Sequence, residues 1–183
     1  MSVLGIQEVY ARIKEEKLIE GLGGRDLDNP EGTGVDLRLG AVHIITEGGA
    51  FIEADTDTSL GKRKGVKTKE LATEDLQEVL IEPGTYYLVQ TRETVNVPLD
   101  LMLTIYPRTS LFRSGLILVA SKADPGYSGP LTFGLTNESK FPVTLQIGAR
   151  ICNAVFYTIE GESIAYRGQH QGGRISFGEE TQV

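Results

Sequence analysis

Apolar residues at the start of the chain recur at helical spacing. Between Ile6 and Leu18 they return every three or four positions, which predicts one amphipathic helix at the N-terminus. The glycine-rich stretch at 21–24 should end this helix, because glycine is unfavourable inside helices. The polar residues 25–34, with Pro30 among them, predict a loop.

From Val35 onward the pattern changes to short apolar stretches, several of which alternate with polar residues as half-buried strands do. Turn-forming sequences such as Pro83–Gly84 and Pro125–Gly126 separate them. The expected strands are 35–39, 41–45, 78–81, 85–91, 101–106, 116–120, 131–136, 143–147 and 151–157. Many short strands without intervening helices predict an all-β barrel or sandwich.

Two segments depart from this pattern. Residues 54–76 are polar, with acidic positions first and basic positions after them, so we expect a mobile insertion. The alternative is a basic flap that assists phosphate binding. Residues 161–183 are rich in glycine and glutamine and predict a flexible tail that closes over a bound ligand. The remainder, 1–160, is then a single β domain.

Composition narrows the function classes. The 183 residues carry a net charge of −7, which argues against a general nucleic-acid surface. The single cysteine, Cys152, excludes an intramolecular disulfide and a multi-cysteine metal cage. The N-terminal residues lack the pattern of a leader peptide, and no apolar run is long enough for a membrane span. We therefore expect a soluble, cytoplasmic protein.

Candidate chemistry is concentrated in two segments. At 107–113 two arginines, Arg108 and Arg113, surround two hydroxyls, and this combination suits an oligophosphate. At 123–129 the carboxylate of Asp124 precedes a Pro–Gly turn and Tyr127. A carboxylate beside a phosphate site can activate water, although on local sequence alone it can equally cap the turn.

Taken together, five ordered segments resemble the trimeric dUTPase and dCTP deaminase family. They are 34–40, 107–113, 123–129, 148–154 and, more loosely, 167–177. Residues 82–86 and 91–100 also look like the deaminase branch. The resemblance implies a distorted β-barrel or jelly roll with a short N-terminal helix, assembled as a homotrimer with active sites between subunits. It also implies a deoxynucleoside triphosphate, dUTP or dCTP, bound with Mg²⁺.

The resemblance also implies roles for individual residues. Asp124 would deprotonate a water, and Asp36 would hold a water on the magnesium ion. Arg113 matches an arginine that deaminases use, and Thr109 stands where they usually have serine. The remaining substrate contacts would be Arg108 and Ser110 on phosphate oxygens, Tyr127 against the sugar, Asn153 in place of a glutamine, and Arg174 or Arg167 on the γ-phosphate.

The reaction depends on one position. Deaminases resembling this chain carry a glutamate as proton shuttle where this sequence has Gly134, and Glu138 lies four residues further on. The zinc-deaminase motif is also absent. We therefore expect hydrolysis of dUTP to dUMP and pyrophosphate. The alternatives are deamination of dCTP and a catalytically silent nucleotide-binding trimer.

Overall fold

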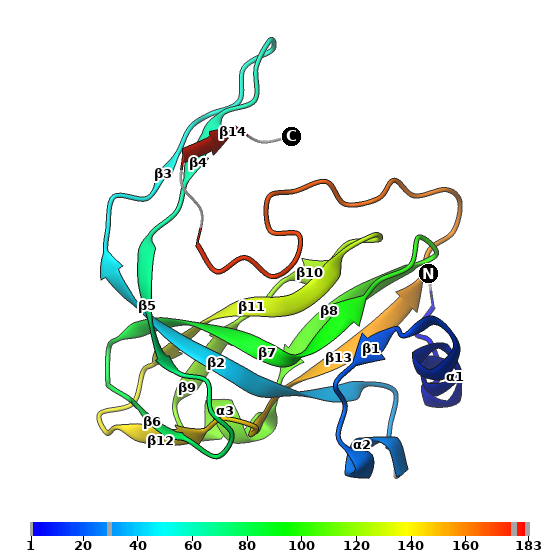
Figure 1. The fold of residues 1–183 in the computed structure, drawn as a ribbon, viewed down its shortest axis with the longest axis horizontal. Coiled ribbons are helices and arrows are strands. Elements are labelled where there is room, and N and C mark those ends of the chain that lie inside the picture. Colours follow the sequence, from blue (N-terminus) through cyan, green and yellow to red (C-terminus); the bar gives the residue numbers. More distant parts are fainter. Residues whose placement is uncertain (1, 29–30, 177–178, 182–183) are drawn as a thin grey trace.

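In the computed structural model a curled antiparallel sheet forms an open barrel, with two short helices against one end (Figure 1). The structure describes residues 2–28, 31–176 and 179–181. This architecture confirms the expected all-β class with an N-terminal helix. Among the described residues, no helix has the length and apolar character needed to cross a membrane.

The helices are short and the strands account for most of the regular structure. The helices are α1 (Ile6–Glu16), α2 (Gly24–Asp28) and α3 (Thr109–Arg113). The strands are β1 (Ile19–Glu20), β2 (Val35–Glu47), β3 (Phe51–Ile52), β4 (Lys62–Lys64), β5 (Lys67–Ala72), β6 (Glu78–Ile81), β7 (Tyr86–Asn96), β8 (Leu101–Pro107), β9 (Leu116–Val119), β10 (Lys122–Ala123), β11 (Ser128–Asn137), β12 (Val143–Gln146), β13 (Arg150–Thr158) and β14 (Glu179–Thr181).

The main sheet has the order β10-β8-β13-β2-β7-β11-β9, with β1 added to β7 and β5 added to β2. Its register brings three segments that are distant in sequence into one row. Asp36 of β2 lies opposite Asn153 of β13, and Asn153 lies opposite Tyr106 of β8. Because directly opposed residues point to the same face of a sheet, this row gathers polar side chains on the outer surface.

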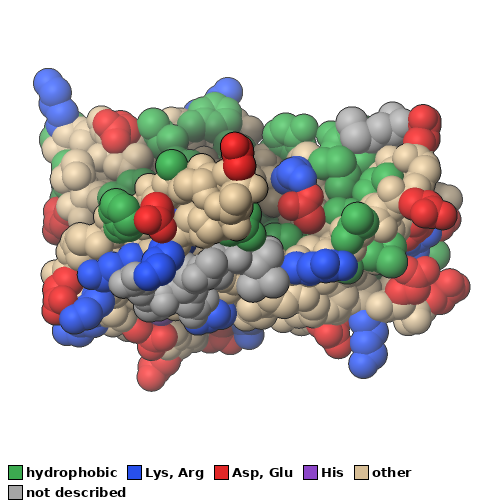
Figure 2. Space-filling view, turned by 90° about the horizontal axis from the view of Figure 1, so that it is seen from above, with side chains coloured by type: hydrophobic (Ala, Val, Ile, Leu, Met, Phe, Trp, Pro, Cys, Tyr) green, Lys and Arg blue, Asp and Glu red, His purple; other side chains and the backbone are tan. Residues whose placement is uncertain are grey.

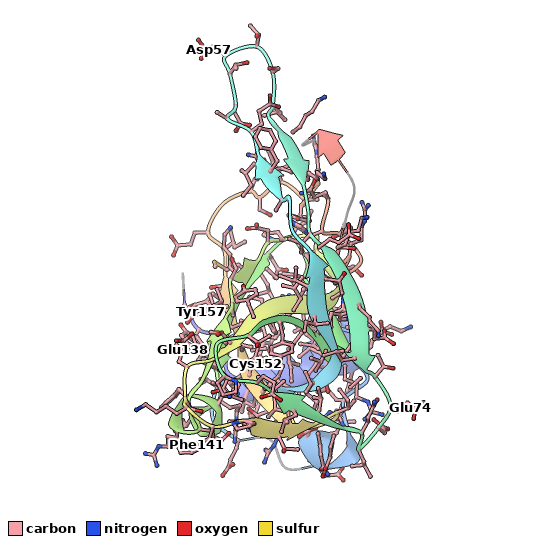
Figure 3. All side chains as sticks on the ribbon, turned by 90° about the vertical axis from the view of Figure 1, so that its left-hand side faces the viewer. Asp57, Glu74, Glu138, Phe141, Cys152 and Tyr157 are labelled. Carbon is pink, nitrogen blue, oxygen red and sulfur yellow. The ribbon has the colours of Figure 1, made fainter. Side chains whose placement is uncertain are left out.

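The alternation of buried and partly exposed residues in β2 shows that this row of polar side chains lies on the outer face of the sheet. Val35, Leu37 and Leu39 are buried in the core, so Asp36 and Arg38 between them point outward. The core is one continuous apolar cluster from α1 and the sheet, and the sulfur-bearing Cys152 lies inside it (Figure 3). Cys152 is fully buried.

Most predicted elements are confirmed, and the differences have physical reasons. The strands expected at 35–39 and 41–45 are one long strand, β2, which passes Gly40 with a register shift. The loop expected at 25–34 begins with helix α2, whose single turn has no long apolar stripe to reveal it; positions 29–30, including Pro30, lie outside the described residues. The segment 54–76, expected to be a mobile insertion, contains β4 and β5.

Residues 51–64 form an arm that projects from the barrel, with Asp57 at its tip (Figure 3). Its strands β3 and β4 pair with each other, and β14 from the far end of the chain pairs with β4. Most residues of β4 and β5 face solvent, so these strands lack the apolar alternation by which sequence reveals a half-buried strand.

We expect Gly40→Ala to reduce the free energy of unfolding by about 1–3 kcal/mol, because forced overpacking strains the sheet. A Cβ at this position would lie 2.7 Å from the backbone N and Cα of Arg92. The matched control is Gly24→Ala, where a Cβ meets nothing within 4 Å. Urea unfolding of both variants measures the difference, and equal midpoints would contradict the close approach of β2 and β7.

Candidate functional site

The candidate residues fall into two separate cavities. One is strongly polar and lies where β2, β8 and β13 meet. The other lies between the hairpin around Asp124, the C-terminal tail and the base of the arm. The residues implied as one active site are therefore divided within a single chain.

The polar cavity, about 540 Å³ in volume, is organised by the carboxylate of Asp36. One of its oxygens, Oδ2, accepts hydrogen bonds from Arg108 at 2.5 Å and from Arg150 at 3.0 Å. The other, Oδ1, accepts from the amide of Asn153 at 3.0 Å. The Asp36 side chain is only 12% exposed, whereas both arginines remain more than a third exposed. The guanidinium groups are thus fixed in orientation yet reachable by an anion.

Arg150 is the basic residue of this cavity that the sequence interpretation missed, as it also missed the lining residues Tyr10, Asp26 and Glu31. It lies inside the fourth segment of the resemblance, 148–154, directly before the apolar residues of β13. A charge at the first position of a strand is unremarkable by itself, so only its register opposite Arg38 and its bond to Asp36 single it out.

Gly34 shapes the same cavity from the side. A Cβ at this position would overlap the amide oxygen of Asn153 and approach the carbonyl oxygen of Ala154 to 2.8 Å. Glycine at position 34 therefore lets the chain pass close to β13 immediately before Asp36. This explains why the motif at 34–40 begins with glycine.

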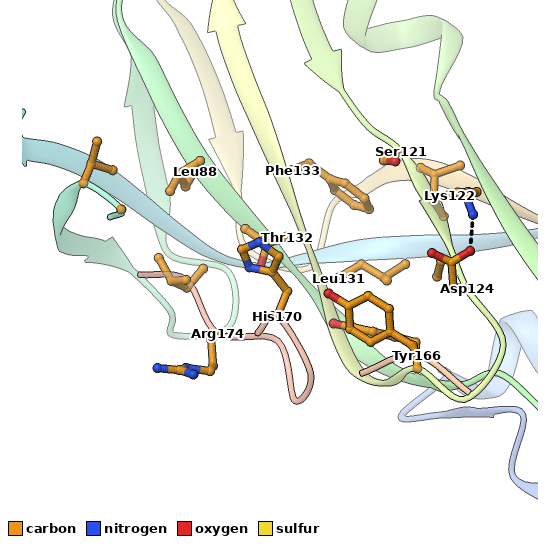
Figure 4. Close-up of a pocket in the computed structure, with 16 residues that line it drawn as sticks. Leu88, Ser121, Lys122, Asp124, Leu131, Thr132, Phe133, Tyr166, His170 and Arg174 are labelled. Carbon is orange, nitrogen blue, oxygen red and sulfur yellow. Dashed lines mark hydrogen bonds and ion pairs between the residues drawn. The ribbon is translucent and has the colours of Figure 1, made fainter. Parts of the chain in front are cut away.

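The second cavity, about 480 Å³ in volume, holds Asp124 (Figure 4). Asp124 forms an ion pair with Lys122, and both side chains are partly exposed. The walls combine apolar side chains with polar ones from the tail. Its principal lining residues are Leu88, Leu131, Phe133, Tyr166, His170 and Arg174. An apolar cavity with a few convergent polar groups suits the sugar and base of a nucleoside.

Tyr127 stiffens the hairpin that carries Asp124. Its hydroxyl donates a 2.6 Å hydrogen bond to the carbonyl oxygen of Pro130, and its ring meets that of Tyr166 edge to face, with the centroids 5.7 Å apart. Burial raises the pKa of Tyr127 to about 12. The phenol therefore stays neutral at physiological pH and acts as a packing surface and hydrogen-bond donor.

The remaining predicted residues lie apart from the two cavities. Thr109, Ser110 and Arg113 are exposed on helix α3 and line neither of them. Of the two tail arginines, Arg174 lines the Asp124 cavity and Arg167 is exposed elsewhere. Phe177, the end of the loosely matching tail segment, lies outside the described residues.

At Gly134 the space that a side chain would need is already filled. A Cβ there would overlap the hydroxyl of Tyr86, whose ring lies across the glycine from the neighbouring strand β7. Glu138 is exposed on the loop that follows β11, where it accepts a hydrogen bond from Thr136. Glu138 therefore does not replace the carboxylate that is missing at position 134.

The residues present do not form a direct magnesium site. Within the described parts of the chain, no three His, Cys, Asp or Glu side chains are grouped so that they could hold a metal ion. Both oxygens of Asp36 already accept hydrogen bonds from cationic or amide donors, so its charge is compensated. A contact from Asp36 to magnesium through water remains a prediction.

Comparison with known proteins decides the family. A family model described as dCTP deaminase-like matches residues 3–159. The chain belongs to this family. The expected resemblance to the dUTPase and dCTP deaminase family is thereby confirmed.

Relatives and a solved structure agree with this assignment. A "dCTP deaminase, dUMP-forming" of Dictyoglomus turgidum is 32% identical over 165 residues, which cover 86% of this chain and 80% of the relative. A "dCTP deaminase" of Pyrococcus furiosus is 37% identical over 126 residues, covering 68% of this chain and 81% of the relative. The dCTP deaminase structure from Agrobacterium tumefaciens superposes with a TM-score of 0.62 at 20% identity over 84% of this chain. This chain spans about half of that protein (47%), and the likeness shows the fold.

These findings support an enzyme of the dCTP deaminase and dUTPase family. They favour the dCTP deaminase alternative over the dUTP hydrolysis that the sequence interpretation placed first. The reason for the difference is that the interpretation gave most weight to the missing glutamate at position 134, whereas the family match extends over most of the chain.

We expect Asp36→Ala to lower the free energy of unfolding by about 1–3 kcal/mol, because hydrogen bonds to a charged group are lost and two guanidinium groups are left facing each other. Asp124→Ala is the control: its partly exposed ion pair with Lys122 should contribute less than about 1 kcal/mol. Urea unfolding compares the two. Similar losses would show that Asp36 does not organise the polar cavity.

Proposed function

We propose that this chain binds a pyrimidine deoxynucleoside triphosphate and converts dCTP to dUMP. One water replaces the amino group at C4 of cytosine, which leaves as ammonia. A second water attacks the α-phosphate, and pyrophosphate leaves. The observation that carries this proposal is the similarity, over 86% of the chain, to a relative named as a dUMP-forming dCTP deaminase.

The two cavities support a shared active site in a homotrimer. One chain presents guanidinium groups in one cavity and a carboxylate with an apolar wall in the other. A nucleoside triphosphate needs both kinds of surface, so we propose that the Asp124 cavity of one subunit faces the Asp36 cavity of its neighbour. The exposed residues Thr109, Ser110 and Arg113 of α3 would then contact the substrate at that interface.

In this arrangement the triphosphate is held by guanidinium groups and the reactive water by Asp124. Arg108 and Arg150 supply paired N–H donors to phosphate oxygens, with the amide of Asn153 beside them. Asp124 is the one carboxylate among the described residues that line its cavity, which makes it the candidate general base. Tyr127 packs against the deoxyribose.

A second candidate function is release of pyrophosphate without deamination. It is favoured by Gly134, which carries no acid–base group and is covered by the Tyr86 hydroxyl. Gly134 does not line the Asp124 cavity, so the candidate general base for hydrolysis is present whatever residue stands at position 134. An enzyme with this arrangement would hydrolyse dUTP, or dCTP itself, and leave the base unchanged.

We expect the purified protein to release ammonia and pyrophosphate from dCTP in equal amounts in the presence of magnesium. Ammonia is measured with a coupled dehydrogenase assay and pyrophosphate with a pyrophosphatase-coupled assay, each also with dUTP. Pyrophosphate without ammonia would transfer the assignment to the second candidate. Binding of either triphosphate without turnover would exclude both.

We expect Asp124→Asn to lower turnover about 10²–10⁴-fold while triphosphate binding is retained, because an amide cannot accept the proton of water. Glu138→Gln, at an exposed carboxylate that follows the other end of β11, is the matched control and should retain activity.

The same variant tests the shared site. Refolding equal amounts of Asp124→Asn and Arg108→Ala chains together should restore turnover at about a quarter of all sites, since each mixed trimer then has one interface with both intact residues. Light scattering should give three times the 19.9 kDa of one chain. Monomers with full activity would contradict the proposal.

A further inference from the structure

Tyr86 is the first residue of β7, and its side chain reaches across the neighbouring strand β11. Its backbone lies opposite Thr136, whereas its hydroxyl lies over Gly134, two residues nearer the start of β11. A diagonal reach of this kind is within the length of an aromatic side chain. The ring therefore leans along the sheet by one pair of residues, towards the row in which Gly134 pairs with Leu88.

This lean brings the hydroxyl to one end of the Asp124 cavity. Leu88, the partner of Gly134, lines the cavity, and so does Thr132, the next residue of β11 on the same face. In Figure 4, Leu88 lies at the opposite end of the cavity from Asp124. A nucleotide whose sugar lies beside Asp124 would therefore extend its base towards Leu88 and the Tyr86 hydroxyl.

Gly134 provides the space in which the hydroxyl lies. A Cβ at this position would overlap the Tyr86 hydroxyl and would lie 2.6 Å from the ring carbon that bears it. The backbone of Gly134 does not have a positive φ, so its conformation alone would accept other residues. Glycine inside a strand often marks a place where another group approaches closely. Here that group is the phenol of Tyr86.

The hydroxyl of Tyr86 is available to a ligand. Tyr86 is 43% exposed, and within the described parts of the chain no group forms a hydrogen bond with its hydroxyl. The next residue shows the contrast. Tyr87 is buried in the core, and its hydroxyl accepts a 3.1 Å hydrogen bond from the backbone N of Glu82. Of these two adjacent tyrosines, one therefore supports the fold and the other presents an unpaired polar group at the cavity.

The surface around the hydroxyl is apolar. Ile117 and Val119 of β9 lie opposite Thr136 and Gly134, and both are about half exposed. Hydrophobic side chains also reach the surface elsewhere, as the view from above shows (Figure 2), so they do not identify a site by themselves. A polar group among apolar ones is what fixes the orientation of a flat heterocycle that packs against them.

We propose that the Tyr86 hydroxyl binds the substituent at C4 of the pyrimidine. A phenol hydroxyl both donates and accepts, so it accepts from the amino group of cytosine and donates to the oxygen of uracil. An ionised carboxylate only accepts hydrogen bonds and would favour cytosine alone. Tyr86 thus holds the base both before and after the amino group is replaced. This inference rests on the proposed function, in which one site holds cytosine first and uracil afterwards.

Tyr86→Phe removes the hydroxyl and keeps the ring. Calorimetry with magnesium compares two triphosphates that carry an imido group between the α- and β-phosphates, which prevents hydrolysis. One has uracil as its base, and the other has pyrimidin-2-one, with hydrogen at C4. We expect the variant to bind the uracil nucleotide about 3–10-fold more weakly, because one neutral hydrogen bond is lost, and the pyrimidin-2-one nucleotide equally well. Equal losses for both nucleotides, or no loss for either, would overturn the contact.

Two further variants separate the hydroxyl from its surroundings. Gly134→Ala keeps the tyrosine but places a methyl group where its hydroxyl lies, so we expect the same selective loss. Tyr157→Phe is the matched control. It removes a hydroxyl that bonds to Tyr106 and lines neither cavity, so both affinities should stay unchanged. Light scattering completes the comparison, since a weakened oligomer of Tyr86→Phe with unchanged affinities would assign Tyr86 to a subunit contact instead.

These binding measurements distinguish the inference from the proposed function. A selective loss in Tyr86→Phe assigns Tyr86 to the base even when neither dCTP nor dUTP is turned over, and then the proposed function alone fails. Turnover of dCTP without a selective loss means that the inference alone fails. Absence of binding of the uracil nucleotide to the unaltered protein would overturn both.

Discussion

The carboxylate of Asp36 accepts hydrogen bonds from Arg108, Arg150 and Asn153, which lie 72, 114 and 117 residues further along the chain. A mostly buried carboxylate between two guanidinium groups compensates their mutual repulsion and fixes their orientation. Three strands must be in register for these bonds to form. The polar cavity is therefore a consequence of the sheet order, and the orientation of both arginines depends on an acidic residue whose two oxygens already accept hydrogen bonds.

That register is stabilised two residues further along β2. Glu93 of β7 is fully buried, and it accepts hydrogen bonds from the backbone N and the Nε of Arg38 at 2.7 and 2.6 Å. The same guanidinium group donates to Gly21 O after β1 at 2.5 Å. A slip of β2 by one residue would bury Asp36 and Arg38 and leave Glu93 without a partner, which is costly for a buried charge. The ion pair between Arg38 and Glu93 thus keeps β2 in the register that places Asp36 on the outer face of the sheet.

The sequence predicted the strands well where one face is buried, as in β2 and β11, because alternation is visible there. It failed for α2, β4 and β5, which are short or mostly solvent-exposed and carry little apolar pattern. Of the candidate residues, Asp36, Arg108, Asn153, Asp124, Tyr127 and Arg174 line the two cavities. Arg150 and Lys122 were missed because their roles arise from register and from a partner, and neither is encoded in local spacing. The division of the candidate residues between two cavities of one chain could not be read from the motifs, since motif order does not show which residues lie close together in the fold.

Position 134 connects the fold to the choice of reaction. Tyr86 covers Gly134 from the adjacent strand and is itself 43% exposed, so the space above the glycine holds a phenol hydroxyl instead of a carboxylate. Water attack on an α-phosphate needs a base near the triphosphate, which Asp124 can supply from its own hairpin. Attack on C4 of cytosine needs proton transfer at the base, on the opposite side of the sugar. If both steps occur in this chain, the step at the base must take its proton carrier from a position other than 134, because β11 carries glycine there and Tyr86 of β7 fills the space above it. The carboxylate that we propose for phosphate hydrolysis and the position that we connect with deamination thus lie in different parts of the chain, Asp124 before the hairpin turn and residue 134 within β11.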